Sequence, residues 1–501
     1  MKTKIIIILL AIFTLAGCED FLTVTPETAL SSATFFKTEA DFKQAVNAVY
    51  VPLRSIVNDR AYLLNEMHSD NTYYARNILF GATEQQEDIA DFAVPTANGI
   101  TSNTHVLNQY RLDYLIIARA NQILATIDNV EFDAVSKNNV KGQAHFLRAY
   151  AYFELVQYFG KVPLHLEPVS VRQEAALPLS EVSEIYTQII ADATAATTEL
   201  LARGATGFEE GRASIGAAKT LLGTVYMVQK NWAQAEAQFK DVVNSTKYSL
   251  IQTGYANVFS SSTSNKNNAE SIFQVQFLEG AAGFNGNFMY NFMPRPMTGA
   301  ELRTLSETSN PQDLTGEGNN TPTPDIIAAY EVGDLRKDAS IGYITLSGSL
   351  RANKVYPYIK KFVRPHALHN NHGMNFPVYR YAEVLLSLAE VLNEQGKTGE
   401  AATYLNQVRT RAGLSNSTNP DLRDAIYKER RVELAFENKR WFDLVRTGQA
   451  IAVITAYGSR IKATPLDYYY PAGAVPRSNA FSNISLLYGL PADESSLSPY
   501  F

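Results

Sequence analysis

GTVYMVQKNWAQAEAQFKDV, residues 223–242, is the stretch that decides the fold. Its Gly-x-x-Tyr and Ala-x-x-x-Phe spacings match the two helices of the 34-residue tetratricopeptide repeat, in which small residues let antiparallel helices approach closely. The matching positions are Gly223, Tyr226, Ala235, Phe239 and Val242. The pattern predicts a helical hairpin, with Phe239 filling the gap to the next hairpin.

A second copy of the pattern follows in the carboxyl-terminal half of the chain. Its matching positions are Ala389, Leu392, Ala401, Leu405 and Val408. Because about three repeats are usually needed to bury a continuous core, two copies imply further, degenerate hairpins. We expect residues 118–159 to form one of them and residues 182–201 to supply a helix of another.

Further helices can be predicted from their end signals. Thr38 followed by Asp41 is typical of a capping box, and the apolar positions after it have helical spacing: Phe42, Ala45, Val46, Val49 and Leu53. A second helix is expected over residues 110–127, and a third over residues 140–159, ending at Gly160. The third is apolar on most faces, so we expect it to be buried on nearly all sides.

Between residues 248 and 376 the helical period disappears. The stretch has loop and short-strand composition, and a long irregular region framed by a rigid scaffold is more often functional than idle. The sequence therefore predicts an all-α (mainly α) fold, a tetratricopeptide-like helical-hairpin scaffold with long irregular loops and short strands inserted. We expect one domain over residues 38–501, divided into a scaffold (38–247 and 377–460), a loop-rich insert (248–376) and an irregular carboxyl-terminal segment (461–501).

The amino terminus has the pattern of a secretory signal peptide. Lys2 and Lys4 precede an apolar run about half as long as the roughly 20 residues that cross a bilayer. The run closes with Leu15-Ala16-Gly17-Cys18, which resembles the bacterial lipobox, and Cys18 is the only cysteine in the chain. We expect residues 1–17 to be removed, and Cys18 to carry lipid and to begin a tether over residues 18–37. The alternative is an ordinary cleavage site with an incidental free thiol.

Composition excludes some classes of partner. A formal net charge of −6 without a basic block argues against nucleic acid, because phosphate binding needs clustered Lys and Arg. With 46% apolar residues and no cysteine pair, the protein must be held together by packing alone. The chain has 28 Tyr and 25 Phe but 2 Trp, a profile common in exported proteins that bind uncharged polar ligands.

Several blocks of the sequence resemble one known family. The most specific is Glu429–Phe436 followed by Arg440–Leu444. The other blocks are Cys18–Leu22, Phe35–Leu53, Phe146–Gly160 with Val162–Leu164, Asn231–Ala233, Tyr379–Leu386 and Leu405–Gly413. In these blocks the chain resembles the SusD/RagB family of outer-membrane nutrient-binding lipoproteins, the SusD-like proteins of the starch-utilisation-system type.

The resemblance implies a function. Members of this family sit on the extracellular face of the outer membrane of Gram-negative bacteria, close over a SusC-like TonB-dependent barrel transporter, and deliver a captured nutrient to it. The resemblance implies a lipid-anchored receptor for an oligosaccharide or polysaccharide, with no catalysis, cofactor, metal or nucleic acid. The alternatives are a RagB-like receptor for peptides, a surface glycoside hydrolase, and a scaffold that only props the transporter.

Two clusters supply what sugar binding needs, which is flat apolar faces flanked by planar hydrogen-bonding groups. The first cluster is Asp70, Asn71, Tyr73, Tyr74 and Arg76. The second is Phe284, Asn287, Phe288 and Tyr290, with Asn285, Asn291 and Phe292 beside them. We expect both to lie in loops that touch ligand. The alternative for each is loop packing or a transporter-facing surface.

Other conspicuous groups are better interpreted as structural. Glu429, Arg430, Arg431 and Glu433 have the spacing of ion pairs within one helix, which would fix its contact with Arg440 and Trp441. Trp232 and Trp441 are expected to be packing anchors, so ligand stacking would fall to Tyr, Phe or Arg.

The histidines at 366, 369 and 372 share a three-residue spacing within a loop. Because no carboxylate adjoins His366, His369 or His372, we expect a solvated loop rather than a metal site. The sequence has no Gly-x-Ser-x-Gly elbow, no His-Glu-x-x-His and no phosphate-binding glycine loop. Paired glycosidase carboxylates need not be close in sequence and remain open.

Overall fold

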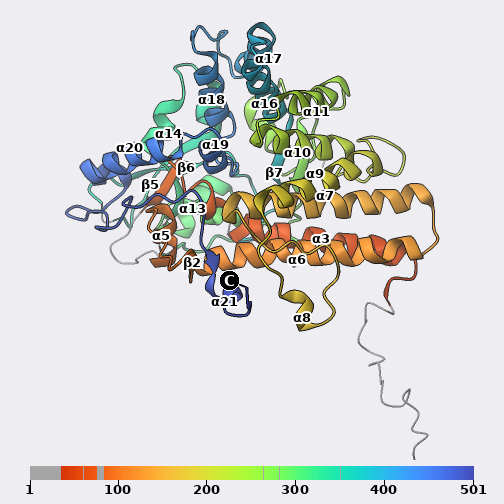
Figure 1. The fold of residues 1–501 in the computed structure, drawn as a ribbon. Helices are drawn as coiled ribbons and strands as arrows, with labels where there is room; N and C mark the ends of the chain where they lie inside the picture. Colours follow the sequence, from red (N-terminus) through yellow and green to blue (C-terminus); the bar gives the residue numbers. More distant parts are fainter. Residues whose placement is uncertain are drawn as a thin grey trace, which may run out of the picture.

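A computed structural model describes residues 35–59, 61–75, 84–262, 265–280, 283–316, 318–349 and 351–500. The expected signal peptide, the lipidation site Cys18 and most of the expected tether lie outside these described residues, as does Arg76. Within the described part, helices dominate and strands are few and short (Figure 1). The predicted mainly α class is confirmed.

The long helices form one continuous array in which each helix packs against the next. Along the array, α3 contacts α6, α6 contacts α7, α7 contacts α9, α9 contacts α10, α10 contacts α11, and α11 contacts α16. The last members, α17 and α18, both pack on α16. The helices are α3 (Glu39–Asp59), α6 (Thr104–Thr126), α7 (Ala134–Phe159), α9 (Val182–Glu199), α10 (Ile215–Val228), α11 (Trp232–Asn244), α16 (Tyr381–Glu394), α17 (Thr398–Arg411) and α18 (Leu422–Glu433).

Both predicted repeat hairpins are present, as α10–α11 and α16–α17. In the first hairpin Gly223 lies against the ring of Phe239 so closely that a Cβ at residue 223 would stand 2.8 Å from a ring carbon. Both Phe239 and Leu405 are fully buried. The degenerate hairpin expected over residues 118–159 is the α6–α7 pair, and the helix expected at 182–201 is α9.

The predicted capping box and the predicted end of α7 are confirmed, whereas the predicted starts of α6 and α7 are too late. Thr38 and Asp41 form the expected capping box, since the Thr38 N–H donates to the Asp41 carboxylate at 2.8 Å and the Asp41 N–H donates to Thr38 Oγ1 at 3.3 Å. Helices α6 and α7 begin six residues before the predicted starts, at N-caps Asn103 and Asp133. The α7 helix ends as predicted before Gly160, which has a φ of 70°.

The strands form two-stranded sheets rather than one layer. Three pairs are antiparallel: β1 (Thr72–Ala75) with β4 (Gly318–Pro322), β3 (Ser271–Val275) with β7 (Phe376–Arg380), and β5 (Ile341–Thr345) with β6 (Val355–Ile359). The fourth pair, β2 (Ile100–Thr101) with β8 (Leu490–Pro491), is parallel. The insert contributes β3 to β6, so its predicted short strands are present.

The remaining α-helices complete the described part of the chain; all have eight residues or fewer except α20, which has 14. They are α4 (Ala61–Leu64), α5 (Glu84–Ala90), α8 (Arg172–Ala175), α12 (Phe288–Asn291), α13 (Gly299–Ser306), α14 (Pro324–Ala329), α15 (Leu335–Ser340), α19 (Arg440–Arg446), α20 (Ala450–Ala463) and α21 (Ala492–Ser495). One apolar core extends from Phe42 to Tyr488, and a smaller cluster joins Tyr290 and Tyr356 of the insert to Tyr469 of the carboxyl-terminal segment. The division of the domain at residues 248 and 376 stays a prediction.

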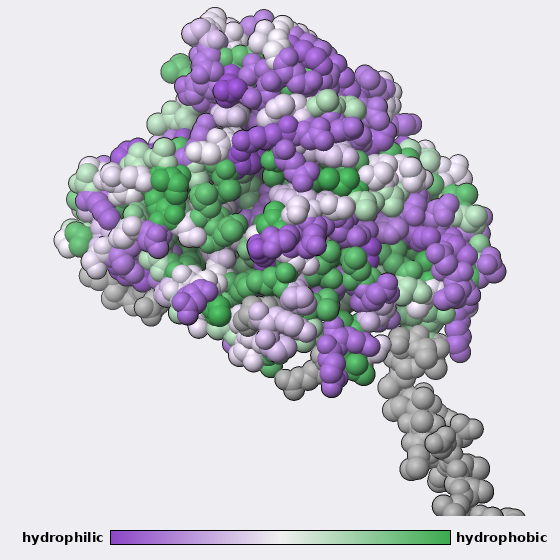
Figure 2. Space-filling view, viewed as in Figure 1, coloured by the Kyte–Doolittle hydropathy of each residue, from purple (hydrophilic) through white to green (hydrophobic). Residues whose placement is uncertain are grey.

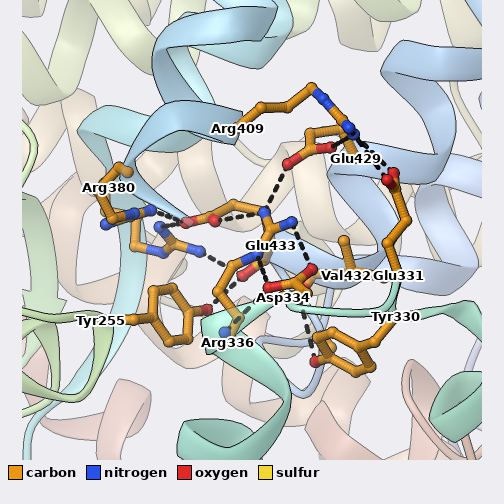
Figure 3. Close-up of polar contacts among 12 residues, drawn as sticks. Tyr255, Tyr330, Glu331, Asp334, Arg336, Arg380, Arg409, Glu429, Val432 and Glu433 are labelled. Atoms are coloured by element: carbon orange, nitrogen blue, oxygen red, sulfur yellow. Dashed lines mark hydrogen bonds and ion pairs between the residues drawn. The ribbon is translucent and has the colours of Figure 1, made fainter. Parts of the chain in front are cut away.

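A buried charge network joins the insert to the scaffold (Figure 3). At its centre Glu433, the last residue of α18, accepts hydrogen bonds from Arg336 at 2.9 Å and from Arg380 and Arg411. Arg336 lies in α15 of the insert, Arg380 ends β7 and Arg411 ends α17. These four side chains are at most 1% exposed, so one carboxylate holds three segments together out of contact with water.

The arginines of this network are shared with further carboxylates. Arg380 also binds Glu270 at 2.8 Å and Glu437 at 2.7 Å, and Arg411 binds Glu270 at 3.0 Å. Burial alone would raise the pKa of Glu433, but the charges of the surrounding arginines outweigh it and hold that pKa well below its usual value. Glu433 therefore stays ionised inside the protein.

The predicted ion pairs within α18 are wrong. The side chains instead pair with other segments: Glu429 with Arg409 at 2.9 Å, Arg430 with Asp443 at 3.2 Å, and Arg431 with Asp70 at 2.9 Å. Other segments surround α18 on several sides, so its charged side chains form ion pairs with those segments rather than with one another. The interpretation of these residues as structural is supported, and Trp441 next to them is 1% exposed.

Substitution at the helix crossing tests the repeat packing. Gly223→Ala should lower the free energy of unfolding by about 1–3 kcal/mol, because the added methyl group overlaps the ring of Phe239. Gly399→Ala in α17 is the matched control, since its Cβ would meet nothing within 4 Å. It should be neutral or stabilise by about 0.5 kcal/mol. Denaturant unfolding measures both, and equal effects would contradict close packing at Gly223.

Removing the central charge of the network should be far more costly. Glu433→Gln should lower the free energy of unfolding at pH 7 by about 3–5 kcal/mol, because it leaves buried arginines without their counter-ion. The pKa of Glu433 is lowered in the folded state, so its contribution is present above the ordinary value of 4.5 and is lost as pH falls below it. Wild type and variant should therefore converge in acid, and a pH-independent difference would contradict the assignment.

Candidate functional site

The first predicted cluster is not in a loop but in and beside β1. Asp70, Asn71, Tyr73 and Tyr74 are each at most 2% exposed. Asp70 accepts hydrogen bonds from Arg440 at 2.8 and 3.1 Å. Burial opposes its charge, but the neighbouring arginines lower the pKa of Asp70 to about 2.

The two tyrosines of this cluster are likewise held inside the protein. Tyr73 bonds through its hydroxyl to Asp91 and, at 2.9 Å, to the hydroxyl of Tyr470. Its ring packs edge to face on Tyr74, with centroids 5.9 Å apart. A ring with no exposed face cannot stack on a sugar, so the expectation that this segment presents aromatic faces to ligand is contradicted by its burial. We assign these residues to packing, and Arg76 lies outside the described residues.

Most of the second cluster is buried too. Phe288 and Tyr290, both in α12, are at most 2% exposed, and Asn287 is half-buried. Phe288 packs edge to face on His372, with centroids 4.6 Å apart, and the Tyr290 hydroxyl bonds to His366. Phe288 and Tyr290 are therefore packed inside the insert with no exposed ring face, and ligand contact by Asn287 stays a prediction.

The histidine loop differs from its prediction in the same way. His366 and His372 are 7% and 2% exposed, so the expected solvated loop is wrong for both, while His369 is half-buried. Burial lowers the pKa of His372 to about 3, so it is neutral at physiological pH. Phe277, Phe288 and Tyr290 surround these rings, which explains why a sequence rich in Asn and His is nevertheless buried.

Phe284 is the exception in the predicted set, because its side chain is 51% exposed. It stands at one wall of a groove of about 580 Å³ that runs between the outer face of α3, the turn at residues 209–212 and the chain that leaves β3. Leu278, also 51% exposed, and Val51, 42% exposed, give the groove further apolar surface. The polar side chains of the groove are Asn47, Arg54, Glu209, Glu210, Arg212, Gln274 and Gln276.

Two arginines of the groove lie against aromatic rings. The guanidinium of Arg54 is 4.7 Å from the centroid of Phe284, and that of Arg212 is 5.2 Å from the centroid of Tyr50. Partial burial lowers the pKa of Arg54 without discharging it. Because each arginine is held over a ring, its planar donors stay at the groove surface.

The position of Phe284 is fixed by hydrogen bonds between the insert and α3. The side chain of Asn58, near the end of α3, accepts from the Asn287 N–H at 2.9 Å, and its main-chain carbonyl accepts from Asn291 Nδ2 at 2.8 Å. The Leu278 N–H donates to the Phe284 carbonyl at 2.8 Å. These hydrogen bonds tie the backbone on which the exposed ring stands to α3 and to the chain after β3.

Sequence reasoning found Phe284 but missed its partners on α3. Asn47, Val51 and Arg54 are spaced i, i+4 and i+7, on the face opposite the buried positions Val46 and Val49. That spacing on an otherwise amphipathic helix was a readable signal for an exposed face with a single arginine. The turn at 209–212 carried no comparable signal.

The other expected features of the sequence can also be located. Trp232 is half-buried and packs on the main core, and Trp441 contacts His68 and Phe92, so both tryptophans are packing anchors as expected. Among the described residues, no group of three or more His, Cys, Asp or Glu is placed to hold a metal ion. Of the helices in the described ranges, none has the length and apolarity of a membrane span.

Comparison with known proteins adds to this geometry. One family model, described as the SusD family, matches residues 345–471. A second, described as starch-binding associating with outer membrane, matches residues 20–227. Together they cover the hairpin α16–α17, nearly all of α10 from the other hairpin, the helices α3, α6, α7 and α9, and the charged helix α18.

Relatives match along nearly the whole chain. A SusD-like protein of Formosa agariphila is 28% identical over 99% of this chain and 97% of its own, and a SusD-like protein of Bacteroides ovatus is 26% identical over 89% and 82%. Among solved structures, a laminarin binding SusD-like protein has a TM-score of 0.71 at 26% identity, over 91% of this chain and 100% of its own. A SusD-like carbohydrate binding protein of Bacteroides fragilis has a TM-score of 0.72 at 24% identity, over 93% and 99%, and shows the same fold.

The repeat hairpins, the Glu429–Phe436 and Arg440–Leu444 blocks, the two family matches and the full-length relatives agree: the chain belongs to the SusD/RagB family.

Proposed function

We propose that the protein is a cell-surface receptor that binds a glycan in the groove beside Phe284. The observation that carries the proposal is an exposed aromatic ring backed by an arginine in a groove of about 580 Å³. A flat ring packs on the C–H face of a sugar, while Arg54 and Asn47 offer planar hydrogen-bonding groups to its hydroxyls. The groove is open along its length, which suits a chain of sugars better than a single small molecule.

The comparisons support a carbohydrate as the ligand class. The relative described as laminarin binding aligns with the whole of its own length, and the family model over residues 20–227 is described as starch-binding. A peptide remains the second ligand class. We keep the peptide class because Trp441 is buried and Trp232 is half-buried, which leaves stacking to Phe284. The ring of Phe284 also suits an apolar peptide side chain.

Delivery and anchoring complete the proposal. We infer that the captured glycan passes to a SusC-like TonB-dependent barrel, and that lipid on Cys18 holds the receptor on the extracellular face of the outer membrane. The Leu15-Ala16-Gly17-Cys18 motif and the description of the family as associating with the outer membrane support this inference. We propose binding rather than catalysis, because the laminarin-binding relative and the matched family model are described by what they bind. A surface glycoside hydrolase stays the alternative, since Glu209 and Glu210 also line the groove.

A binding assay tests the groove. Phe284→Ala should weaken the affinity for the best ligand of a glycan panel that includes laminarin and starch by about tenfold, since losing one stacking contact costs about 1.4 kcal/mol. Phe284→Tyr keeps the flat face and should retain the affinity. Isothermal titration on the purified mature protein measures both.

Tyr343→Ala is the matched control for that assay, since Tyr343 is a 55% exposed aromatic side chain in β5, away from the groove. It should leave the affinity unchanged. If Tyr343→Ala abolished binding while Phe284→Ala did not, the ligand would bind elsewhere. If the protein bound peptides from a matched panel and no glycan, the ligand class would be wrong.

The anchor has an independent test. Cys18→Ala protein should lose fatty-acid label and appear in the soluble fraction after cell lysis, because the acylated thiol is removed. Cells producing the wild-type protein serve as the control. A Cys18→Ala protein that kept its label and sedimented with membranes would contradict lipid attachment at this residue.

A further inference from the structure

The arginines of this protein are, with one exception, engaged by the protein itself. Hydrophilic residues dominate the upper part of the face shown in Figure 2, over α16–α18, and there Arg423 binds Glu394 at 2.6 Å. Among the arginines whose side chains the structure describes, every one but Arg54 forms an ion pair or donates a hydrogen bond within the chain. Arg54 lines the groove at Phe284.

The guanidinium of Arg54 has its hydrogen-bonding capacity unused. It is half-buried on α3, and the contact that holds it is the ring of Phe284, whose centroid is 4.7 Å away. A guanidinium carries five N–H donors and accepts no hydrogen bond. Taking a charged group partly out of water without a partner costs free energy. A cation kept in this way at a binding surface is suited to an anion that arrives with the ligand.

The other charges of the groove are already balanced. Arg212 lies 3.2 Å from the carboxylate of Glu209 and also donates to Asn47. The carboxylate of Glu210 lies 3.6 Å from Arg203. Both carboxylates that line the groove thus have an arginine of their own. Arg54 leaves the groove with one positive charge that no described carboxylate neutralises.

The geometry puts this charge beside the surface on which a sugar would pack. The side chain of Phe284 is 51% exposed, and the guanidinium of Arg54 stands over its ring. A sugar that packs against Phe284 therefore lies next to the cation. The carboxylate of an acidic sugar is planar and can accept two parallel hydrogen bonds from a guanidinium, and a sulfate group can do the same. A neutral sugar would leave the charge of Arg54 without a counter-ion.

We propose that the groove selects glycans that contain acidic sugars, and that Arg54 sets this selectivity by binding their carboxylate or sulfate groups. The inference rests on the proposed function and goes further, because it names the charge of the ligand. The formal net charge of −6 does not oppose it, since exposed charges more than about 8 Å away are largely screened at physiological ionic strength. An ion pair formed at close range in a half-buried groove is screened much less.

Titration calorimetry with three oligosaccharides of similar length tests the inference on the purified mature protein. The probes are an oligogalacturonate, which carries carboxylates, a carrageenan oligosaccharide, which carries sulfates, and a laminarin oligosaccharide, which is neutral. At least one acidic probe should bind about tenfold more tightly than the neutral one. The acidic probe that binds identifies which anionic group Arg54 takes.

Variants of Arg54 separate charge from shape. Arg54→Gln should weaken the acidic probe about tenfold and change the affinity for laminarin by less than about twofold, because only the acidic probe loses an ion pair. Arg54→Lys keeps the charge without the planar fork, so it should keep part of the preference. Raising the salt concentration from about 0.05 M to about 0.5 M should weaken the acidic probe and leave laminarin unchanged.

Arg303→Gln is the matched control. Arg303 is an exposed arginine of α13 that does not line the groove, so the substitution removes the same charge elsewhere. The preference for the acidic probe should persist in this variant. Thermal unfolding of each variant checks that it is folded.

The possible failures can be told apart. If laminarin bound at least as tightly as both acidic probes and Phe284→Ala weakened it, the proposed function would stand and the role of Arg54 would be overturned. A preference for acidic probes that survived Arg54→Gln would overturn that role as well, because the anion would then have another partner. If none of the three probes bound, the inference would be overturned together with the glycan receptor on which it rests.

Discussion

The ion pairs of Glu433 are the interaction on which the rest of the fold depends. A helical array of this kind is held together by packing between neighbouring helices. An inserted segment of loops and short strands does not take part in that packing and needs other contacts to hold it. Glu433 provides such a contact, because Arg336 of the insert, Arg380 of β7 and Arg411 of α17 all form ion pairs with its carboxylate. Arginine suits this role, since its planar fork can bind several carboxylates at once.

The ion pairs of Glu433 also hold one wall of the groove in place. Because β3 pairs with β7, and β7 ends in Arg380, the strand that leads toward Phe284 is anchored to the charged centre. The opposite wall of the groove is α3, whose own position is set by packing on α6 and by the bonds of Asn58 to the insert. A segment of loops and short strands thereby supports one exposed ring.

The scaffold was predictable from the sequence, and most of the site was not. Gly223 with Phe239, and Thr38 with Asp41, report local geometry that depends on spacing along the chain, so the repeat hairpins and the start of α3 could be foreseen. The burial of Tyr73 depends on Asp91 and Tyr470, and that of His372 on Phe288, partners far away in the chain that no local pattern reveals. For the same reason the charges of α18 were recognised as structural but assigned to the wrong partners. Phe284 was found because it is aromatic beside glycines, yet nothing local distinguished it from Phe288.

Helix α3 and strand β3 both border the groove and also an inner cavity of about 80 Å³ enclosed by α3, α7, α10, β7 and α19. Val51 and Arg54 face the former, Ile56 and Val57 face the latter, and Leu53 lines both. If a sugar chain in the groove displaced α3, it would change the affinity of the inner cavity for any ligand by some factor. By thermodynamic reciprocity, such a ligand would change the affinity of the groove for the sugar by the same factor. Because Leu53 lines both spaces, a shift of this one side chain would be felt in both.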